Sequence, residues 1–494
     1  MPKRPLIAAL AAAALTGCGA APAQTLEGSA PVEEREEVTR ALRQAREAAL
    51  GGDFAVAQRL LDEARALAPK SPAVWVDIAR LRFRRGDHAG ALEAAQEALG
   101  HGPRFAPALV LRGQMARDAF GLGAALVWFE AALEADPDNT LALTEYAATL
   151  GDAGYHGQML AAVRRLTKVE EKSPDAMYLQ AVLAARAQMP VLAKNLLERS
   201  GKAENEVPAA LMLDALVDLL ENNHDSAAET LERLARRQPG NVRVSELLAK
   251  AMWLGGRDEE LVARFAQAAR HEAASPYLAM LVGRAHERLG NRAAAAPFLE
   301  RAYAGRPMGW TALDAQSRDD LPPQTTRMRE LVSAGQVGAA ASYGASLRRD
   351  LPRSADIAAL AGDAAFAARN PRGALELYRD AALIRRSWPL TRKAAAAYRD
   401  LGDPLAADVL VARHLRGEPR NTEALLLYAE RSARVKDWLR VAVLLDNAIE
   451  LGAGNDPRLL KLRGIAARAL GDEAGAQRFE RMTWELHPGI VPGV

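Results

Sequence analysis

The sequence predicts an all-α fold, a solenoid of repeated helix pairs, from its length, its composition and its periodicity. A chain of 494 residues is far longer than one ordinary domain, so it forms either several domains or one elongated array. Ala and Leu dominate, charged residues make up 26% and aromatic residues 5%, and charges of both signs are interspersed as on solvated helix faces. Prolines recur at a fixed period, which favours the array.

The period, about 34 residues, is read from the spacing of these prolines. Pro69, Pro103 and Pro137 lie one period apart from each other, Pro239 lies five periods beyond Pro69, and Pro307 lies two more periods beyond Pro239. Proline lacks the backbone N–H and clashes with the preceding turn, so each of these residues is expected to end a helix.

The interior of a unit predicts two helices joined by a tight turn. In the unit that ends at Pro103, Gly86 supplies a permissive backbone at the end of the first helix, and Asp87 can cap the next one. Ala91 and Ala98 are small enough to let the two helices approach closely. The unit is therefore expected to be a helical hairpin.

At these positions the sequence resembles the tetratricopeptide repeat family, whose pattern places a large, a small and an aromatic residue, then Ala, an aromatic residue, Ala and Pro at fixed offsets. About thirteen units can be counted between Val38 and Pro488. The resemblance implies a right-handed α-α superhelix with a concave inner surface, and a non-catalytic protein. Two units depart from the pattern, because Met159 and Val441 stand where the first Ala is expected. Clear matches are Gly113, Ala125, Phe129, Ala132 and Pro137; Gly283, Gly290, Ala295, Ala302 and Pro307; Gly362, Ala374, Tyr378 and Ala381; Tyr398, Gly402, Ala407 and Pro419; and Gly464, Gly471 and Ala476.

The period is interrupted once. Pro307 and Pro352 are separated by more than one period and less than two, and the extra segment is polar. We therefore expect one array at 38–307, an interrupting loop at 308–325 and a second array at 326–494. A single continuous array with one long loop is an equally good interpretation.

The first residues have the layout of a bacterial export signal. Lys3 and Arg4 precede an apolar run, Pro5–Leu15, that is too short to span the ~30 Å hydrocarbon layer of a membrane. The following "LTGC" resembles the lipobox of bacterial lipoproteins, which implies removal of residues 1–17 and lipidation of Cys18, the only cysteine. Residues 18–37 are then expected to be a flexible tether. An ordinary secretory signal with a chance cysteine is the alternative.

The resemblance also implies a binding surface. In the family the first helix of each unit lines the groove, and its groove-facing offsets place an apolar stripe in the central units, since exposed aromatic and Met side chains are typical interface anchors. The alternative is that these side chains belong to the core. The same offsets give Arg80 and Arg84, Arg284 and Arg288, and Arg458, Lys461 and Arg468, which could hold acidic partner groups or simply face solvent. The residues of the stripe are Tyr178, Met212, Leu216, Trp253, Tyr277 and Met280.

No motif predicts catalysis. His271-Glu272 begins like a zinc-protease motif, but Ser275 stands where the second His is needed. Gly121–Leu126 lacks the third Gly of a dinucleotide loop. We therefore expect no enzyme, no cofactor, no metal and no small-molecule substrate. A formal charge of +2 without a basic patch also argues against nucleic acid.

The leading hypothesis is a lipid-anchored scaffold on the periplasmic face of a bacterial membrane. Its partners would be proteins or peptides of an envelope complex for outer-membrane assembly, secretion, pilus formation or polysaccharide export. Gly19 after the cysteine favours the outer membrane over the inner one. The alternatives are a regulatory subunit of one cell-wall synthase or hydrolase, an enzyme built on the loop Gly309–Pro323, and a cytoplasmic co-chaperone.

Overall fold

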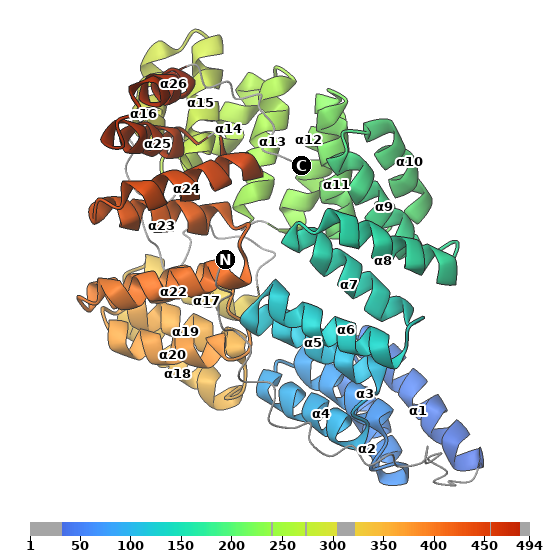
Figure 1. Cartoon of the computed structure of the whole chain (residues 1–494). Helices are drawn as coiled ribbons and strands as arrows, with labels where there is room; N and C mark the ends of the chain where they lie inside the picture. Colours follow the sequence, from blue (N-terminus) through green and yellow to red (C-terminus); the bar gives the residue numbers. More distant parts are fainter. Residues whose placement is uncertain (1–31, 239–240, 272–273, 304–321, 455, 485–494) are drawn as a thin grey trace, which may run out of the picture. The chain divides into compact units, whose positions relative to one another are not determined.

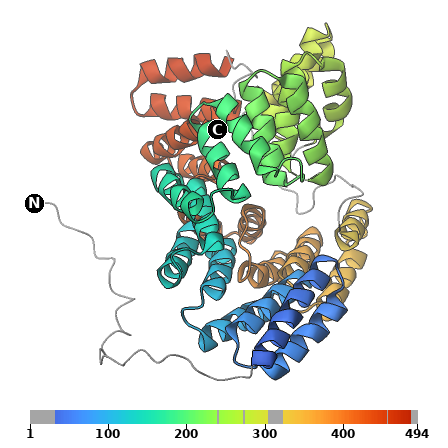
Figure 2. The same cartoon turned by 90° about the vertical axis from the view of Figure 1, so that its right-hand side faces the viewer.

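A computed structural model of the chain describes residues 32–238, 241–271, 274–303, 322–454 and 456–484. Within these ranges the protein contains 26 α-helices and one short π-helical turn, η1 (Ile449–Ala453), and no strand. The helices follow one another as thirteen antiparallel pairs (Figures 1 and 2), which confirms the predicted all-α repeat architecture.

The helices before the interruption are α1 (Val32–Leu50), α2 (Phe54–Leu67), α3 (Pro72–Arg84), α4 (His88–His101), α5 (Ala106–Phe120), α6 (Leu122–Ala135), α7 (Thr140–Ala153), α8 (His156–Val169), α9 (Pro174–Arg186), α10 (Pro190–Ser200), α11 (Pro208–Leu220), α12 (His224–Arg237), α13 (Val242–Leu254), α14 (Asp258–Ala269), α15 (Pro276–Arg288) and α16 (Arg292–Tyr303). Those after it are α17 (Pro323–Ser333), α18 (Val337–Asp350), α19 (Ala355–Ala367), α20 (Pro371–Ala382), α21 (Trp388–Asp400), α22 (Pro404–Gly417), α23 (Thr422–Arg434), α24 (Trp438–Ala448), α25 (Pro457–Ala469) and α26 (Glu473–Trp484).

A residue with positive φ marks the turn inside every pair. This backbone conformation costs little only for glycine, and nine of the thirteen positions are glycine. The residue after it often caps the next helix; the carboxylate of Asp87, for example, accepts from the N–H of Gly90 at 2.9 Å. The predicted turn chemistry is therefore confirmed. The positions are Gly52, Gly86, Gly121, Gly154, Gln188, Asn222, Gly256, Gly290, Gly335, Arg369, Gly402, Lys436 and Gly471.

Small residues allow the two helices of a pair to pack closely. A Cβ added to Gly113 of α5 would lie 2.4 Å from the ring of the buried Phe129 of α6. Met159, which stands where Ala is expected, is accommodated in the same way by a small residue on the facing helix. Its side chain is 1% exposed, and a Cβ added to Gly151 would lie 2.7 Å from its sulfur. The departure from the repeat pattern therefore does not disrupt the pair.

The interruption of the period falls between α16 and α17. Eight pairs precede it and five follow, and the second set begins at Pro323, inside the predicted loop. Residues 304–321, which include most of that loop, lie outside the described ranges. At the other end, α1 begins at Val32, so the last residues assigned to the tether are helical.

The chain divides into two compact units. The described part of the first unit contains α1 and α2, which pack against each other through residues such as Leu42, Ala45 and Leu61. The second unit, from Lys70 onward, contains the other helices of the first array, α3–α16, together with the second array, α17–α26.

Within the second unit the two arrays contact each other along a seam. At α4 and α19, the ring Nδ1 of the buried His88 accepts from the N–H of Ala355 at 3.0 Å. Arg353 forms ion pairs with Asp87 at 2.9 Å and with Glu93 at 2.6 Å. In Figure 1 the orange helix α19 of the second array accordingly lies beside α4 of the first.

A second contact joins α5 and α6 to α20–α22. The N–H of Arg386 donates to the carbonyl of Asp118 at 2.8 Å, and the side chains of Arg385 and Asp118 lie 3.6 Å apart. A Cβ on Gly121 would lie 2.5 Å from the Cα of Gly417, so only glycine permits this approach of the two backbones.

The third contact brings α25 against α15 and α16. The rings of Tyr303 and Trp484 stack with centroids 6.1 Å apart, so the ends of α16 and α26 also touch. The seam therefore joins the second, third and last pairs of the first array to pairs of the second array that follow in the same order.

Candidate functional site

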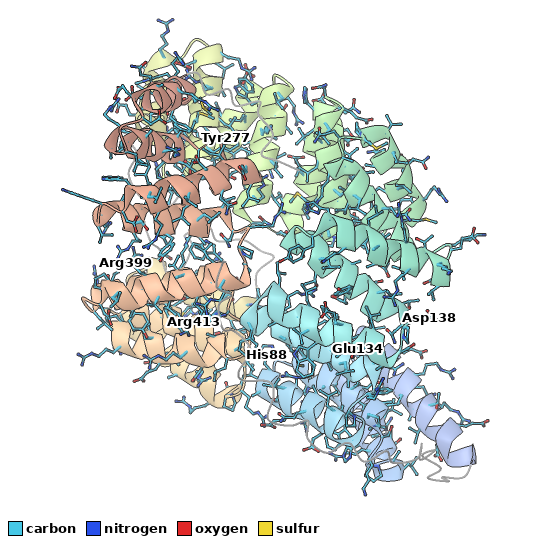
Figure 3. All side chains as sticks on the ribbon, in the orientation of Figure 1. His88, Glu134, Asp138, Tyr277, Arg399 and Arg413 are labelled. Atoms are coloured by element: carbon cyan, nitrogen blue, oxygen red, sulfur yellow. The ribbon has the colours of Figure 1, made fainter. Side chains whose placement is uncertain are left out.

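The predicted groove residues lie on the first helices of successive pairs. Tyr178 is on α9, Met212 and Leu216 on α11, Trp253 on α13, and Tyr277 and Met280 on α15; Figure 3 labels Tyr277. Tyr277 is 5% and Met280 0% exposed, and the other four side chains are partly buried.

The five residues on α11, α13 and α15 belong to one apolar cluster that continues into the second array. Tyr277 and Met280 are buried in it, and Met212, Leu216 and Trp253 pack against it. Tyr178 lies apart, between the two neighbouring clusters of the first array. The second array contributes Leu425, Leu426 and Ala429 of α23, Val441, Leu445 and Ala448 of α24, Leu459, Leu460 and Ala466 of α25, and Phe479 of α26.

The structure therefore places five of the six predicted groove residues in a core that both arrays share, and Tyr178 in the core of the first array alone. In this structure these side chains occupy core positions. The prediction that they bind a partner is not tested by these contacts and stays a prediction.

Two polar residues lie in line with this apolar stripe, and neither was predicted from the sequence as part of it. Glu246 lies one repeat period after Met212 and one before Met280, and Lys250 lies one period after Leu216, so they occupy equivalent positions in the intervening repeat. Both lie on α13, one helical turn apart and on the same face as Trp253. The repeat period itself was the signal that could have found them. We call the face formed by Met212, Leu216, Glu246, Lys250, Trp253, Tyr277 and Met280 the inner face.

Lys250 is the most unusual member of the inner face. Its side chain is 0% exposed, and its Nζ has no hydrogen-bond partner among the described residues. Burial, together with the nearby positive charge of Arg243, lowers the pKa of Lys250 to about 7. A buried ammonium without a partner is costly, so this group calls for an explanation.

Glu246 shows that the second array approaches this face. Burial raises the pKa of Glu246 to about 7, and the negative charges of Glu423 and Asp456 add to the rise, whereas a hydrogen bond with Ser275 opposes it. Glu423 is in the first turn of α23, and Asp456 is the N-cap of α25. The N-terminal ends of both helices are therefore near α13.

Three of the predicted cationic residues, Arg288, Arg458 and Arg468, have partners on neighbouring helices of the chain. The guanidinium of Arg288 lies 4.2 Å from the ring centroid of Trp253 and 2.7 Å from the carboxylate of Asp258. Arg458 pairs with Glu430 at 3.4 Å, and Arg468 pairs with Glu480 at 2.6 Å. These contacts connect neighbouring helices of the arrays.

Cys18 and the segment 1–31 lie outside the described residues. In the part of the chain that the structure covers, no group of His, Cys, Asp and Glu side chains could hold a metal ion. None of the described helices combines the length and apolar character required to cross a bilayer.

Tandem antiparallel helix pairs with a regular sequence period, a glycine-rich turn in each pair and a continuous inner face define an α-α repeat protein. Two sequence models, both described as tetratricopeptide repeat, match residues 48–114 and 215–260. These two segments of the chain are therefore tetratricopeptide repeats, a kind of repeat that generally binds proteins and is not catalytic. Among curated proteins, none has a sequence that matches this chain.

Solved structures of other repeat proteins resemble the chain weakly. PilF of Pseudomonas aeruginosa is 16% identical, with 44% of this chain and 99% of PilF covered and a TM-score of 0.36. PilW, described as a type IV pilus biogenesis factor, is 20% identical, with 44% and 98% covered and a TM-score of 0.34. Yeast Tom70 is 13% identical, with 90% and 99% covered and a TM-score of 0.33. At these TM-scores the similarities carry no argument about the partners or location of this chain.

Proposed function

We propose that the protein is a scaffold that holds other proteins together at a bacterial envelope membrane, to which a lipid on Cys18 attaches it. Its task would be the assembly or localisation of an envelope complex for outer-membrane assembly, secretion, pilus formation or polysaccharide export. The observation that carries the proposal is the succession of thirteen helix pairs among the described residues, because stacked pairs offer extended surfaces suited to proteins and peptides.

The location rests on the sequence. The only cysteine of the chain ends the tetrapeptide "LTGC" directly after an apolar run, and this is the arrangement that lipidation requires. Two or more acyl chains on one cysteine would make the attachment stable, since a single chain binds only marginally.

Replacing the modified residue tests the anchor. The wild-type chain should fractionate with membranes and enter the detergent phase, and Cys18→Ser should move to the soluble fraction. As a control, Ser29→Cys in the Cys18→Ser background moves the thiol away from the lipobox and should not restore membrane attachment. Unchanged membrane fractionation of Cys18→Ser would contradict the anchor.

Capture of partners tests the scaffold. The mature protein carrying a C-terminal tag is purified from crosslinked membranes, and the proteins that come with it are quantified. A stoichiometric set of envelope components supports the scaffold and identifies the complex. Capture of a single enzyme in one-to-one ratio would instead favour a regulatory subunit.

A further inference from the structure

The inner face is covered on the side away from its own array. Helices α13 and α15 are buried nearly all round: residues 247–252 of α13 and 277–283 of α15 are all buried. A first helix of a repeat normally has one face toward the groove, so complete burial requires a second layer. Helices α23 and α25 supply it, since their leucines continue the same apolar cluster and α25 contacts α15 directly.

The covering helices do not satisfy the polar groups beneath them. Lys250 is fully buried, yet no carboxylate of the second array reaches its Nζ among the residues that the structure describes. Instead, the acidic ends of α23 and α25 approach Glu246, which already carries the same sign of charge. The apolar part of the inner face is therefore complementary to the second array, whereas the polar part is mismatched.

Such a mismatch is expected if α23 and α25 cover the inner face but another helix can bind there in their place. A fully buried cation gains most when a carboxylate is brought to it, because charge-assisted hydrogen bonds are strong and the ammonium is already desolvated. Apolar contacts at Met212, Tyr277 and Met280 would be kept by any helix with leucines at the spacing that α25 uses.

We propose that the inner face is a binding site for an amphipathic helix that brings a carboxylate to Lys250, and that α23 and α25 of the same chain occupy this site until such a partner displaces them. The proposal rests on the proposed scaffold function and adds the chemistry of the partner. Displacement requires the second array to move away from the first, and the seam contacts at Asp118 and His88 hold it in place.

The first test asks whether the site is self-occupied. A full-length Cys18→Ser chain carrying Asp118→Cys and Arg385→Cys is prepared in two forms, one joined by a short thiol–thiol crosslinker and one with both thiols capped. The probe is a fluorescent synthetic peptide copying Asp456–Leu470, the sequence of α25 with its N-cap. We expect the capped form to bind the peptide at least about tenfold more tightly than the crosslinked form, because only the capped form can open. Equal affinity, or binding to neither form, would overturn self-occupancy.

The second test asks whether Lys250 takes a carboxylate. Four further peptides carry one glutamate each, in place of the residues that correspond to Arg458, Lys461, Arg463 and Arg468. One of them should bind the capped form about tenfold more tightly than the parent peptide, which is the gain expected from one charge-assisted hydrogen bond. Lys250→Met should abolish that gain and Lys250→Arg should keep it, while both variants still bind the parent peptide. A gain that survives Lys250→Met, or no gain with any peptide, would overturn the role of Lys250.

The binding-site proposal and the scaffold proposal can fail independently of each other. If membrane capture recovers the same partners with Lys250→Met as with the wild type, and the peptides show no dependence on Lys250, the scaffold stands and this inference fails. If no partner is captured in either case, the scaffold itself fails.

Discussion

At the scale of single residues, the inner face is defined by a conflict between burial and charge. Lys250 and Glu246 occupy positions that Leu216, Met212 and Met280 fill with apolar side chains in neighbouring repeats. Apolar residues there would pack without a desolvation cost. The two charged groups therefore lower the stability of the closed arrangement, and their replacement should reveal by how much.

Lys250→Met should stabilise the protein by about 1–3 kcal/mol at pH 6.5, since it removes an unpaired buried ammonium but keeps the aliphatic stem. The pKa of Lys250 is about 7 in the folded protein against 10.5 for an ordinary lysine. Between these values the unfolded chain binds the extra proton, so the wild type recovers stability as the pH rises and the advantage of the variant shrinks. Urea unfolding at pH 6.5 and 10 measures this; the exposed Lys172→Met is the control, and an equal advantage at both pH values would contradict it.

Glu246→Gln should show the opposite dependence on pH. The folded pKa of Glu246 is about 7 against an ordinary 4.5, so the folded protein retains a proton that the unfolded chain has lost, and stability falls as the pH rises between these values. Gln should therefore add about 1–3 kcal/mol at pH 8 and little at pH 5. Thermal unfolding at both pH values measures the difference. The exposed Glu229→Gln should have no effect at either pH, and a gain at pH 5 as large as that at pH 8 would disprove the assignment.

At the scale of the helices, the same substitution of glycine by alanine should change stability in opposite directions at two positions. Gly113→Ala should destabilise the α5–α6 pair by about 1–3 kcal/mol, since the new methyl group would lie 2.4 Å from the ring of Phe129. Gly100→Ala on the exposed face of α4 meets no atom within 4 Å and should stabilise by about 0.5–1 kcal/mol. Hydrogen exchange in the two pairs measures both effects, and destabilisation by both variants would be inconsistent with packing as the cause.

The turn inside each pair gives a second prediction at this scale. Lys436 adopts φ +58° where nine other repeats place glycine, so Lys436→Gly should stabilise the α23–α24 turn by about 0.5–1 kcal/mol. The matched reverse change is Gly402→Ala, at φ +79° with no atom within 4 Å of the added Cβ, and it should cost a similar amount. Denaturant midpoints of the two single variants test the sign, which should be opposite for the two changes.

At the scale of the whole second unit, the stability of the seam should depend more on its buried hydrogen bonds than on its exposed ion pairs. His88→Phe removes the acceptor of the buried Ala355 N–H and should cost about 1–3 kcal/mol. Arg353→Ala removes two ion pairs, but the Arg353 side chain is 43% exposed, so its cost should stay below about 1 kcal/mol. Hydrogen exchange at the N-terminus of α19 measures both, and a larger effect of Arg353→Ala would contradict this ranking.

The same seam should weaken in mild acid. Burial, with the positive charge of Arg385, lowers the pKa of His88 below its ordinary 6.5, against the opposing charges of Asp356 and Asp87. The unfolded chain therefore takes up the proton first as the pH falls. The contribution of His88 is complete above about pH 6.5 and is lost below it. His88→Phe should remove this part of the pH dependence, and this provides an internal control.

The sequence by itself determined the repeat. The regular recurrence of prolines, the glycine–aspartate turns and the small residues at Gly113 and Ala125 act within one helix pair or between neighbouring pairs, so they can be recognised from spacing alone. Spacing also predicts the interrupting loop at 308–325, most of which lies outside the described residues. It placed Met212, Tyr277 and Met280 on one face of the array, because equivalent positions in stacked repeats lie in line.

Only the tertiary structure decided which residues pack against the inner face. The contacts of His88 with Ala355, of Gly121 with Gly417 and of α15 with α25 join residues that are far apart in sequence and follow no period. Whether an apolar stripe is an open groove or a covered core depends on these long-range contacts, which the local pattern does not encode. The burial of Lys250 is the clearest case: in the sequence it is one charged residue among many on a helix, whereas in the structure it is fully buried beside a core that both arrays share.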